Sequence, residues 1–232
     1  MKRILITGGS GDWAQSFKLQ YGDQFHIDTP GRSELDVTGE DSVKGYFARL
    51  SAPYDIVINN AGCIHPKRIL ESDSALWVND IQVNLVGTYY VCKYALTASD
   101  STQLIQVSST AGFNAYKDWS SYCASKAGVI ILSKSLAADG YNSICLCPGA
   151  IDTKFRDYFD LPNNNMMTCE QFSDYVMQVI NGDFTPGDVL FIRANEFELN
   201  PWIPGQLWPT AGLIYLLSRV SFYADWNYNE SR

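Results

Sequence analysis

A short apolar run that ends in a cluster of glycines opens the sequence and limits the folds open to it. Residues 3–7 read RILIT, and Gly8, Gly9 and Gly11 follow before a segment with a helical pattern. A continuous apolar run of this length is typical of a strand buried in a parallel sheet. Glycines between such a strand and a helix let the backbone approach a pyrophosphate, whose oxygens the first N–H groups of the helix can bind. The chain is therefore expected to be an α/β protein with a dinucleotide site after its first strand.

Length and charge limit the number of domains and the kinds of binding partner that this chain can have. With 232 residues the chain is long enough for one α/β domain and short for two. Hydrophobic residues make up 46% of it, which is enough for a substantial core. The net charge of -8 argues against nucleic acid or a membrane surface as a partner. An anionic cofactor stays possible, because backbone N–H groups hold phosphates without net positive charge.

The cysteines and the ends of the chain indicate a compartment. The six cysteines form no CxxC pair, and Cys145 and Cys147 alternate within an apolar run, as core residues on one face of a strand do. We expect free thiols and no metal ligand among them, which fits a reducing compartment. The opening MKRILITGG leaves no room for a signal peptide, and the apolar residues 211–217 fall short of the about 20 that span a bilayer. These features predict a cytoplasmic protein.

The stretch from Ser108 to Lys126, SSTAGFNAYKDWSSYCASK, brings together a hydroxyl, a phenol and an ammonium. If residues 120–136 are helical, Tyr122 and Lys126 are four apart and share a face. A phenol has a reference pKa of about 10, and a cation beside it favours the phenolate, as a proton-transferring Tyr requires. Ser109 follows residues 104–107, which read as a buried strand. Its hydroxyl is therefore expected at the carboxyl end of that strand, where open parallel sheets bind ligands.

Periodicity predicts the remaining elements. Strands are expected near residues 25–29 and at 54–59, 141–147 and 188–193, the last of these ending the sheet. Helices are expected at 40–50 and 169–180, and a long helix at 73–96 carries a stripe spaced for burial that consists of Trp77, Ile81, Leu85 and Tyr89. Residues 29–34 are too few for a crossover helix, so a strand directly after them should be short or missing.

Ser109, twelve intervening residues and then YCASKAG resemble the short-chain dehydrogenase/reductase family. Further stretches similar to family motifs follow the family's order over residues 4–153: TGGSGDWA, NNAG, VNLVG and PGAIDT. The resemblance implies a Rossmann-type, doubly wound parallel sheet of six or seven strands flanked by helices. One domain would then cover residues 1–232, with 154–186 over the substrate and 197–232 as an aromatic C-terminal extension. That extension either caps the core or forms a subunit contact, and we favour the contact.

The glycine turn departs from the family's single-domain branch. Its spacing is similar to the TGxxGxxG of the extended branch, with Asp12 and Ala14 where single-domain members carry glycines. A carboxylate at Asp12 would repel a pyrophosphate unless it points to solvent.

The resemblance also implies roles for individual residues. Tyr122 would exchange the hydroxyl proton, and Ser109 would hydrogen-bond the substrate oxygen. Lys126 would lower the pKa of Tyr122 and bind the nicotinamide ribose, and Asn84 would distort its helix and hold a water in the proton relay. The residues expected to bind the cofactor are Gly8, Gly9, Ser10, Gly11, Asp12, Trp13, Arg32, Ser33, Asp36, Val37, Asn60, Ala61, Gly62, Tyr122, Lys126, Pro148, Gly149, Ile151 and Thr153.

The choice between NAD and NADP depends on the residues after the second strand. A carboxylate such as Asp28 would bind the ribose hydroxyls of NAD, whereas Arg32 and Ser33 would accommodate the extra phosphate of NADP. Both readings stay open, and the likeness of GRSELD to a turn in family reductases favours NADP. His65, three residues beyond NNAG, either lines the substrate mouth or lies on the surface.

Three functions fit these features. The first is an NAD(P)-dependent oxidoreductase that moves a hydride between nicotinamide and a carbonyl or hydroxyl carbon of a small molecule, as a homodimer or homotetramer. The second is a nucleotide-sugar reductase or epimerase, although such enzymes usually carry a larger C-terminal domain. The third is a dinucleotide sensor without catalysis, which would have no need of the Ser, Tyr and Lys set.

Overall fold

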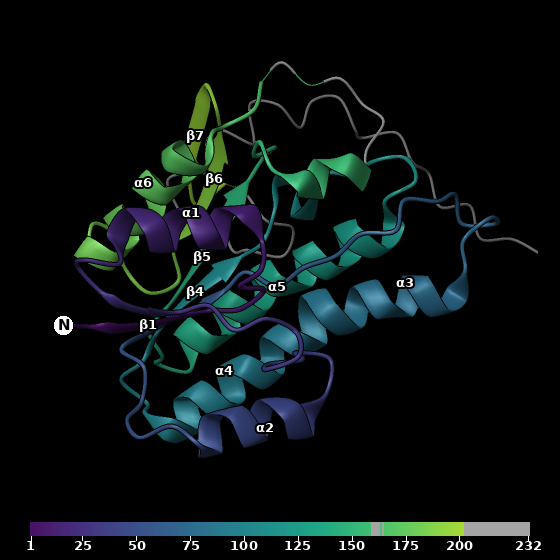
Figure 1. Cartoon of the computed structure of the whole chain (residues 1–232). Coiled ribbons are helices and arrows are strands. Elements are labelled where there is room, and N and C mark those ends of the chain that lie inside the picture. Colours follow the sequence, from purple (N-terminus) through teal and green to yellow (C-terminus); the bar gives the residue numbers. More distant parts are fainter. Residues whose placement is uncertain (159–162, 164, 202–232) are drawn as a thin grey trace, which may run out of the picture. The chain divides into compact units, whose positions relative to one another are not determined.

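The computed structural model describes residues 1–158, 163 and 165–201, within a compact unit that spans Met1–Pro201 (Figure 1). The strands are β1 (Arg3–Ile6), β2 (His26–Asp28), β3 (Ile56–Asn59), β4 (Gln103–Val107), β5 (Ser143–Pro148), β6 (Val189–Arg193) and β7 (Glu196–Leu199). The α-helices are α1 (Asp12–Tyr21), α2 (Glu40–Ala48), α3 (Ser74–Ile81), α4 (Gly87–Ala98), α5 (Ser120–Ala138) and α6 (Cys169–Asn181). Shorter turns are the π-helical η1 (Gln82–Val86) and the 3₁₀-helical η2 (Thr110–Gly112) and η3 (Lys154–Tyr158).

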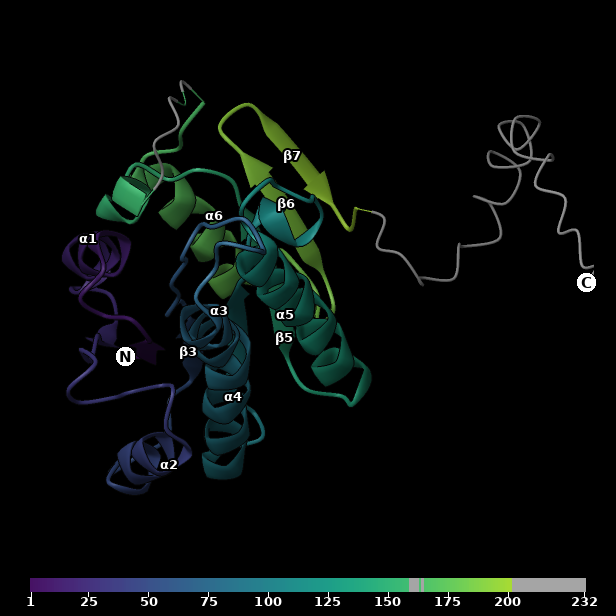
Figure 2. The same cartoon turned by 90° about the vertical axis from the view of Figure 1, so that its right-hand side faces the viewer.

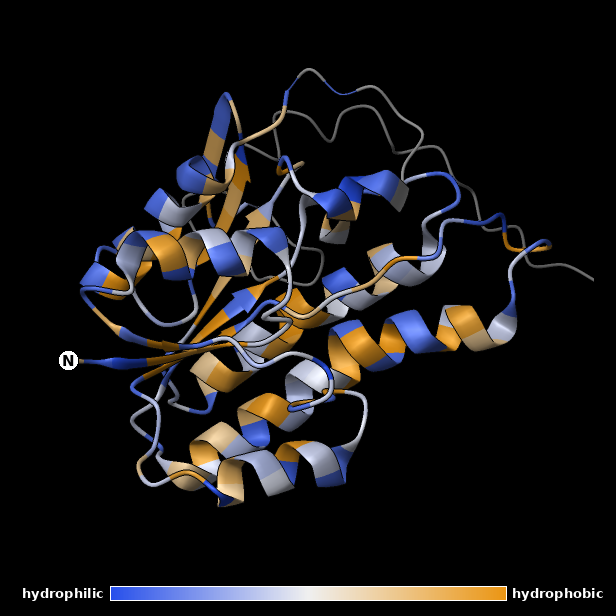
Figure 3. Ribbon diagram, in the orientation of Figure 1, coloured by the Kyte–Doolittle hydropathy of each residue, from blue (hydrophilic) through white to orange (hydrophobic). Residues whose placement is uncertain are grey.

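The seven strands form one sheet in the order β2-β1-β3-β4-β5-β6-β7, and all neighbours except β6 and β7 pair in parallel. Helices cover both faces, with α1 and α6 on one side and α2, α4 and α5 on the other (Figures 1 and 2). Ile4 and Ile6 belong to the core under α1 and α6, whereas Leu5 belongs to the core under α2 and α4. Burial on both faces explains the continuous apolar runs of the central strands (Figure 3). The predicted doubly wound α/β sheet is confirmed.

The order of the strands places a crevice next to β1. This strand pairs with β2 on one side and with β3 on the other, so Ile4 faces both Ile27 and Ile56. The chain thus leaves β1 toward one edge of the sheet and returns on the opposite side. Loops that follow such a pair of strands diverge, and ligands bind in the crevice at their carboxyl ends. The glycine turn follows β1, and NNAG begins at the last residue of β3.

The segment between β2 and α2, residues 29–39, contains turns and no strand. This confirms the inference from the shortness of residues 29–34. Because no further strand joins it, β2 forms one edge of the sheet.

The predicted helix over residues 73–96 is present but interrupted. It consists of α3, then η1, then α4, and Asn84 is the middle residue of η1. A π-helical turn holds one extra residue and is frequent at functional sites.

The buried face of this long helix differs from the predicted one. Tyr89 is 46% exposed, and the other three residues of the predicted stripe are only half-buried. The buried positions include Asp80 and Asn84, which have almost no exposed surface. The stripe prediction was wrong because these polar side chains find hydrogen-bond partners on the loop after β3 and on α5, which apolar periodicity does not reveal.

The prediction that residues 188–193 form the last strand was also wrong. A hairpin leads from β6 into β7, which pairs with it antiparallel. The sequence of β7, EFEL, alternates charged and apolar residues, and all four residues are exposed. Phe197 stacks on Tyr175 of α6 with ring centroids 5.7 Å apart. The rest of the predicted aromatic extension, residues 202–232, lies outside the described residues.

Two further expectations concern the cysteines and the membrane. Cys145 and Cys147 are fully buried on one face of β5, with their Sγ atoms 3.7 Å apart, as predicted. Within the part of the chain that the structure describes, none of the helices has the length and hydropathy of a bilayer-spanning segment.

Candidate active site

The carboxyl end of β4 brings Ser109 to the first turns of α5. Ser109 is 9% exposed, and its Oγ accepts a hydrogen bond of 3.1 Å from the backbone N–H of Ala111, which caps η2. The neighbouring Ser108 donates through Oγ to the carbonyl of Lys126 at 2.7 Å. The bond from Ser108 fixes the end of the strand against the helix that carries the predicted Tyr and Lys.

Tyr122 and Lys126 lie on the same face of α5 and are both buried. The Lys126 Nζ lies 5.6 Å from the centroid of the Tyr122 ring and donates to the carbonyl of Val107 at 2.9 Å. The hydroxyl of Ser109 is also near enough to the Tyr122 phenol to lower its pKa. The structure therefore brings together the hydroxyl, the phenol and the ammonium that the sequence singled out.

The electrostatics of this cluster differ from the expected pattern. Burial raises the pKa of Tyr122, and the nearby hydroxyl of Ser109 opposes this only in part. Burial also lowers the pKa of Lys126 to about 8. The expected lowering of the Tyr122 pKa is not seen, because desolvation of the phenol is the largest influence on it. Tyr122 is consequently a neutral phenol near pH 7, which is the proton-donating form.

Asn84 connects this cluster to the loop after β3. Its Oδ1 accepts from the backbone N–H of Cys63 at 2.8 Å, and its Nδ2 donates to the Cys63 carbonyl at 2.9 Å and to Ser125 Oγ at 3.0 Å. A β-carbon placed on Gly62 would lie 3.3 Å from Asn84 Oδ1 and 3.6 Å from Lys126 Nζ. The NNAG loop, η1 and α5 thus meet at one point.

Replacing Asn84 with Ala should lower the free energy of unfolding by about 1–3 kcal/mol, because half-buried backbone groups of Cys63 and the buried hydroxyl of Ser125 lose a partner. Urea unfolding of the full chain measures this loss. The exposed Asn181→Ala at the end of α6 serves as the control and should change stability by no more than about 0.5 kcal/mol. An equal effect of the two variants would contradict the structural role of Asn84.

The glycine turn crosses the chain that leaves β2. Gly8 has a left-handed φ of 67°, and a β-carbon on Gly9 would lie 2.2 Å from the carbonyl carbon of Thr29. Ser10 and Gly11 are exposed, and Gly11 precedes α1 without any side-chain cap. The first N–H groups of α1 are therefore available to an anion.

The side chains of Asp12 and Trp13 are both engaged by distant parts of the chain. Asp12 Oδ2 accepts from the backbone N–H of Lys154 at 2.7 Å, and its Oδ1 lies 3.8 Å from the ammonium of the same residue. Trp13 is buried in the core and donates to Ser173 Oγ at 3.1 Å. Asp12 thus ties the glycine turn to η3.

Thr7, which sequence reasoning did not select, holds the NNAG loop beside the glycine turn. Its Oγ1 accepts from the backbone N–H groups of Asn60 and Ala61, both at 3.0 Å, and its carbonyl accepts from Asn60 Nδ2 at 3.0 Å. A β-carbon on Gly8 would lie 2.9 Å from the Cα of Ala61. The glycine turn after β1 and the NNAG loop after β3 are therefore in contact. We call the place where these two loops diverge from the sheet the switch point. A Thr that ends a strand could have been noted as a loop anchor.

The charged side chains at and after the end of β2 differ in what they contact. Asp28 accepts from the hydroxyl of Tyr54 at 2.7 Å and pairs with Arg3 at 3.7 Å. The side chain of Arg32 is 76% exposed and pairs with Asp36, whose Oδ1 accepts from Thr38. The carboxylate of Asp28 thus faces protein partners, whereas the guanidinium of Arg32 faces solvent.

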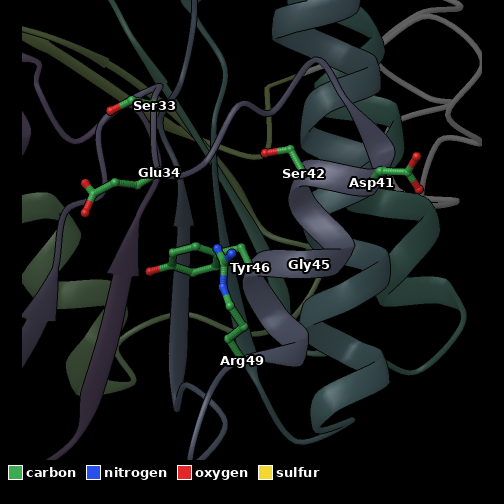
Figure 4. Close-up of a pocket in the computed structure, with 7 residues that line it drawn as sticks. All are labelled: Ser33, Glu34, Asp41, Ser42, Gly45, Tyr46 and Arg49. Atoms are coloured by element: carbon green, nitrogen blue, oxygen red, sulfur yellow. The ribbon is translucent and has the colours of Figure 1, made fainter.

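An open polar hollow of about 370 Å³ lies between the turn after β2 and one face of α2 (Figure 4). Its lining residues are Ser33, Glu34, Asp41, Ser42, Gly45, Tyr46 and Arg49. Ser33 is the one predicted cofactor residue among them, and no predicted catalytic residue lines it. Val37, the other predicted residue of this region, is buried against Gly87.

The PGAIDT loop lies between β5 and η3. The backbone N–H of Gly149 donates to Ile192 at 2.7 Å, and Ile151 forms a parallel bridge with Met167. Thr153 Oγ1 lies 3.4 Å from the Ile151 carbonyl, and Pro148 ends β5. The loop leads to Phe155, whose ring centroid is 6.2 Å from that of Tyr122. Of the predicted substrate cover, residues 159–162 and 164 lie outside the described part.

A polar cluster beside α5 was not predicted as a unit. His65, expected at the substrate mouth or on the surface, pairs through Nδ1 with the buried Asp80 at 2.6 Å. Cys63 Sγ also lies 3.2 Å from Asp80, and Ser121 Oγ donates to it at 2.6 Å. No sequence motif marks these residues, because the loop, α3 and α5 come together only in the fold.

Known proteins similar to this chain point to one family. A family model described as short chain dehydrogenase matches residues 28–163. The chain is 38% identical over 129 residues to cis-4-hydroxycyclohexanecarboxylate dehydrogenase of Sinomonas cyclohexanicum, covering 51% of this chain and 52% of that protein. It is 30% identical over 134 residues to the 3beta-hydroxysteroid dehydrogenase of Mediterraneibacter gnavus, covering 53% and 49%. The matches thus span about half the length of these curated relatives.

A solved structure shares the fold. The alcohol dehydrogenase from the archaeon Thermococcus sibiricus, complexed with 5-hydroxy-NADP, superposes with a TM-score of 0.72 at 19% identity. The superposition covers 84% of this chain and 97% of that protein.

Proposed function

Because the chain belongs to the short-chain dehydrogenase family, we propose that it is an NAD(P)-dependent oxidoreductase acting on a small carbonyl or alcohol substrate. The bound dinucleotide would supply or accept the hydride. One observation carries this proposal: Ser109, Tyr122 and Lys126 lie buried together where β4 ends. Through Gly62 they adjoin the loops of the switch point.

Each residue of the cluster has a part in proton transfer. In the reducing direction, the neutral phenol of Tyr122 donates its proton to the substrate oxygen. Ser109 accepts a hydrogen bond from Ala111, so its own hydroxyl hydrogen can be donated to that oxygen as charge develops. Lys126 uses one of its N–H groups on Val107, which leaves two for a ribose and for a water.

Asn84 would hold that water. Both hydrogens of its amide and one lone pair of Oδ1 are engaged by Cys63 and Ser125. A second lone pair of Oδ1 remains for a water, and a β-carbon on Gly62 would lie 3.3 Å from Oδ1 and 3.6 Å from Lys126 Nζ. We assign a water of the proton relay to this position.

The residues of the switch point fit a dinucleotide. The uncapped start of α1 offers N–H groups to a pyrophosphate, and the carboxylate of Asp12 is engaged by Lys154, which offsets part of its charge. The absence of side chains at Gly8 and Gly9 lets the backbone of the turn lie against Ala61 and Thr29. These features support the predicted cofactor residues of the glycine turn.

The side chains expected near the adenosine ribose of the cofactor favour NADP over NAD. Asp28 is engaged by Tyr54 and Arg3, so it is a poor candidate for the ribose hydroxyls. Arg32 is largely exposed at the turn that follows β2 and can meet an added phosphate.

Arg32→Ala should weaken NADPH binding by about 10–100-fold, the loss of one charged hydrogen bond, and should leave NADH binding within about threefold. Fluorescence titration of both dinucleotides measures the change. Asp28→Ala is the control, because Asp28 is the residue that would give a preference for NAD. This variant should leave the ratio of the NADPH and NADH affinities nearly unchanged. A larger loss for NADH than for NADPH in either variant would contradict the assignment.

The surroundings of Tyr122 suit an apolar part of the substrate. The rings of Trp119 and Phe155 lie 6.1 Å and 6.2 Å from that of Tyr122, and Ile64 packs against it. We therefore propose a ketone or secondary alcohol with an apolar substituent. Oxidation of NADPH against a panel of ketones, aldehydes and keto-sugars tests the proposal, and no turnover with any of them would favour a sensor.

We also propose that the chain self-associates. Large apolar side chains are exposed on α3, α4 and α5, among them Val78 (58%), Tyr89 (46%) and Ile131 (49%). Light scattering after size exclusion would distinguish the expected homodimer or homotetramer from a monomer.

A further inference from the structure

A buried carboxylate beside α5 has no part in the proposed chemistry. Asp80 has no exposed surface, and four donors converge on it. Its Oδ1 lies 2.6 Å from His65 Nδ1 and 3.2 Å from Cys63 Sγ. Its Oδ2 accepts from the backbone N–H of His65 at 3.0 Å and from Ser121 Oγ at 2.6 Å. Among the described residues, no Lys or Arg lies within ion-pair distance of Asp80, and His65 would offset its charge only if protonated.

Against the expectation that no cysteine ligates a metal, we propose that Cys63, His65 and Asp80 bind one divalent cation of the thiolate-preferring kind, such as Zn²⁺. The candidate ligand atoms, one from each residue, all lie within 4.8 Å of one another. Thiolate, imidazole and carboxylate are the ligand types that zinc takes, at about 2.3, 2.0–2.1 and 2.0–2.2 Å. A tetrahedral ion would separate the nitrogen and oxygen ligands by about 3.4 Å. His65 and Asp80 therefore need to part by less than about 1 Å.

The hydrogen bonds to Oδ1 show how the ion would enter. The bonds from Cys63 Sγ and His65 Nδ1 each place a hydrogen atom next to Asp80 Oδ1. A metal ion bound by these three atoms would take the place of those hydrogens. On binding, the thiol of Cys63 releases its proton to solvent, and the neutral imidazole carries its hydrogen on Nε2 in place of Nδ1.

The surroundings support the ligands in the required orientation. Ser121 and the backbone of His65 hold Oδ2 of Asp80, which leaves Oδ1 to the ion. Asn79 Nδ2 lies 3.6 Å from Cys63 Sγ as a donor suited to a thiolate. Such outer hydrogen bonds fix ligand geometry in protein metal sites.

The site is reachable, and it adjoins the proposed catalytic residues. The side chain of His65 is 31% exposed and Cys63 is half-buried, so an ion can enter from their side. Three protein ligands leave a fourth position for water. Ser121 directly precedes Tyr122, so a bound ion would fix the loop after β3 against the start of α5.

Titration of the metal-free full chain with Co²⁺ under reducing conditions tests this site without any dinucleotide or turnover. We expect one equivalent to bind with a thiolate-to-cobalt charge-transfer band in the near ultraviolet, and Zn²⁺ to displace it. Cys63→Ser should remove the band, and His65→Asn should weaken binding at least about tenfold. Cys169→Ser, a half-buried cysteine outside the cluster, is the matched control and should keep the band.

Thermal unfolding provides a second measurement on the same proteins. Zn²⁺ should raise the melting temperature of the unmodified chain and of Cys169→Ser, with a much smaller rise for His65→Asn. Absence of the cobalt band in the unmodified chain would overturn the proposal. So would a band that survives Cys63→Ser, or unchanged affinity in a folded His65→Asn.

Discussion

Replacing Tyr122 with Phe is expected to lower kcat by about 10²–10⁴-fold, the usual contribution of a positioned proton donor. The substitution removes one hydroxyl and keeps the ring, whose contacts with Trp119 and Phe155 at 6.1 Å and 6.2 Å are unaffected. Ser109 keeps its bond to Ala111, so no buried group loses its last partner. Dinucleotide affinity and melting temperature should therefore stay close to those of the unmodified chain.

The measurement is steady-state oxidation of NADPH with the best substrate from the carbonyl panel. Tyr89→Phe is the matched control, since this phenol lies on α4 with 46% of its surface exposed and should retain full activity. A Tyr122→Phe enzyme that retained more than about a tenth of the original kcat would refute the role of this phenol. In that case the family membership would stand, and the proton would come from another group.

Gly9→Ala is expected to reduce dinucleotide affinity by about 100-fold and to lower the free energy of unfolding by about 1–3 kcal/mol. The added β-carbon would lie 2.2 Å from the carbonyl carbon of Thr29 and 2.3 Å from its oxygen. Both contacts are with backbone, which cannot rotate away as the end of a side chain can. The glycine turn and the chain after β2 must separate, and both contribute predicted cofactor residues.

Isothermal titration with NADPH and urea unfolding measure the two effects. Gly45→Ala in α2 is the control, because a β-carbon there would meet nothing within 4 Å. Ala is the better helix former by about 0.5–1 kcal/mol, so this control should be neutral or stabilising. Normal affinity in Gly9→Ala would show that the crossing of these two segments does not shape the cofactor site.

Several features of the fold were predictable because the signals for them are local. Apolar runs such as residues 104–107 become central strands covered on both faces, and the glycines after β1 stand where a side chain would meet a neighbouring backbone. The missing strand after β2 follows from chain length alone. The same local reasoning failed for the stripe on α3 and α4. The burial of Asp80 and Asn84 depends on donors and acceptors from distant parts of the chain.

The sequence by itself determined the α/β class, the glycine turn after the first strand and the spacing of Ser109, Tyr122 and Lys126, since each depends on neighbours within one turn or one strand. Only the tertiary structure decided the state of the charged groups. Asp12 is turned to Lys154, 142 positions away, and burial raises the pKa of Tyr122 against the expected direction. The Cys63, His65 and Asp80 cluster likewise exists only where the loop and α3 pack together. Burial and long-range hydrogen bonds set charge and orientation, and no local pattern encodes them.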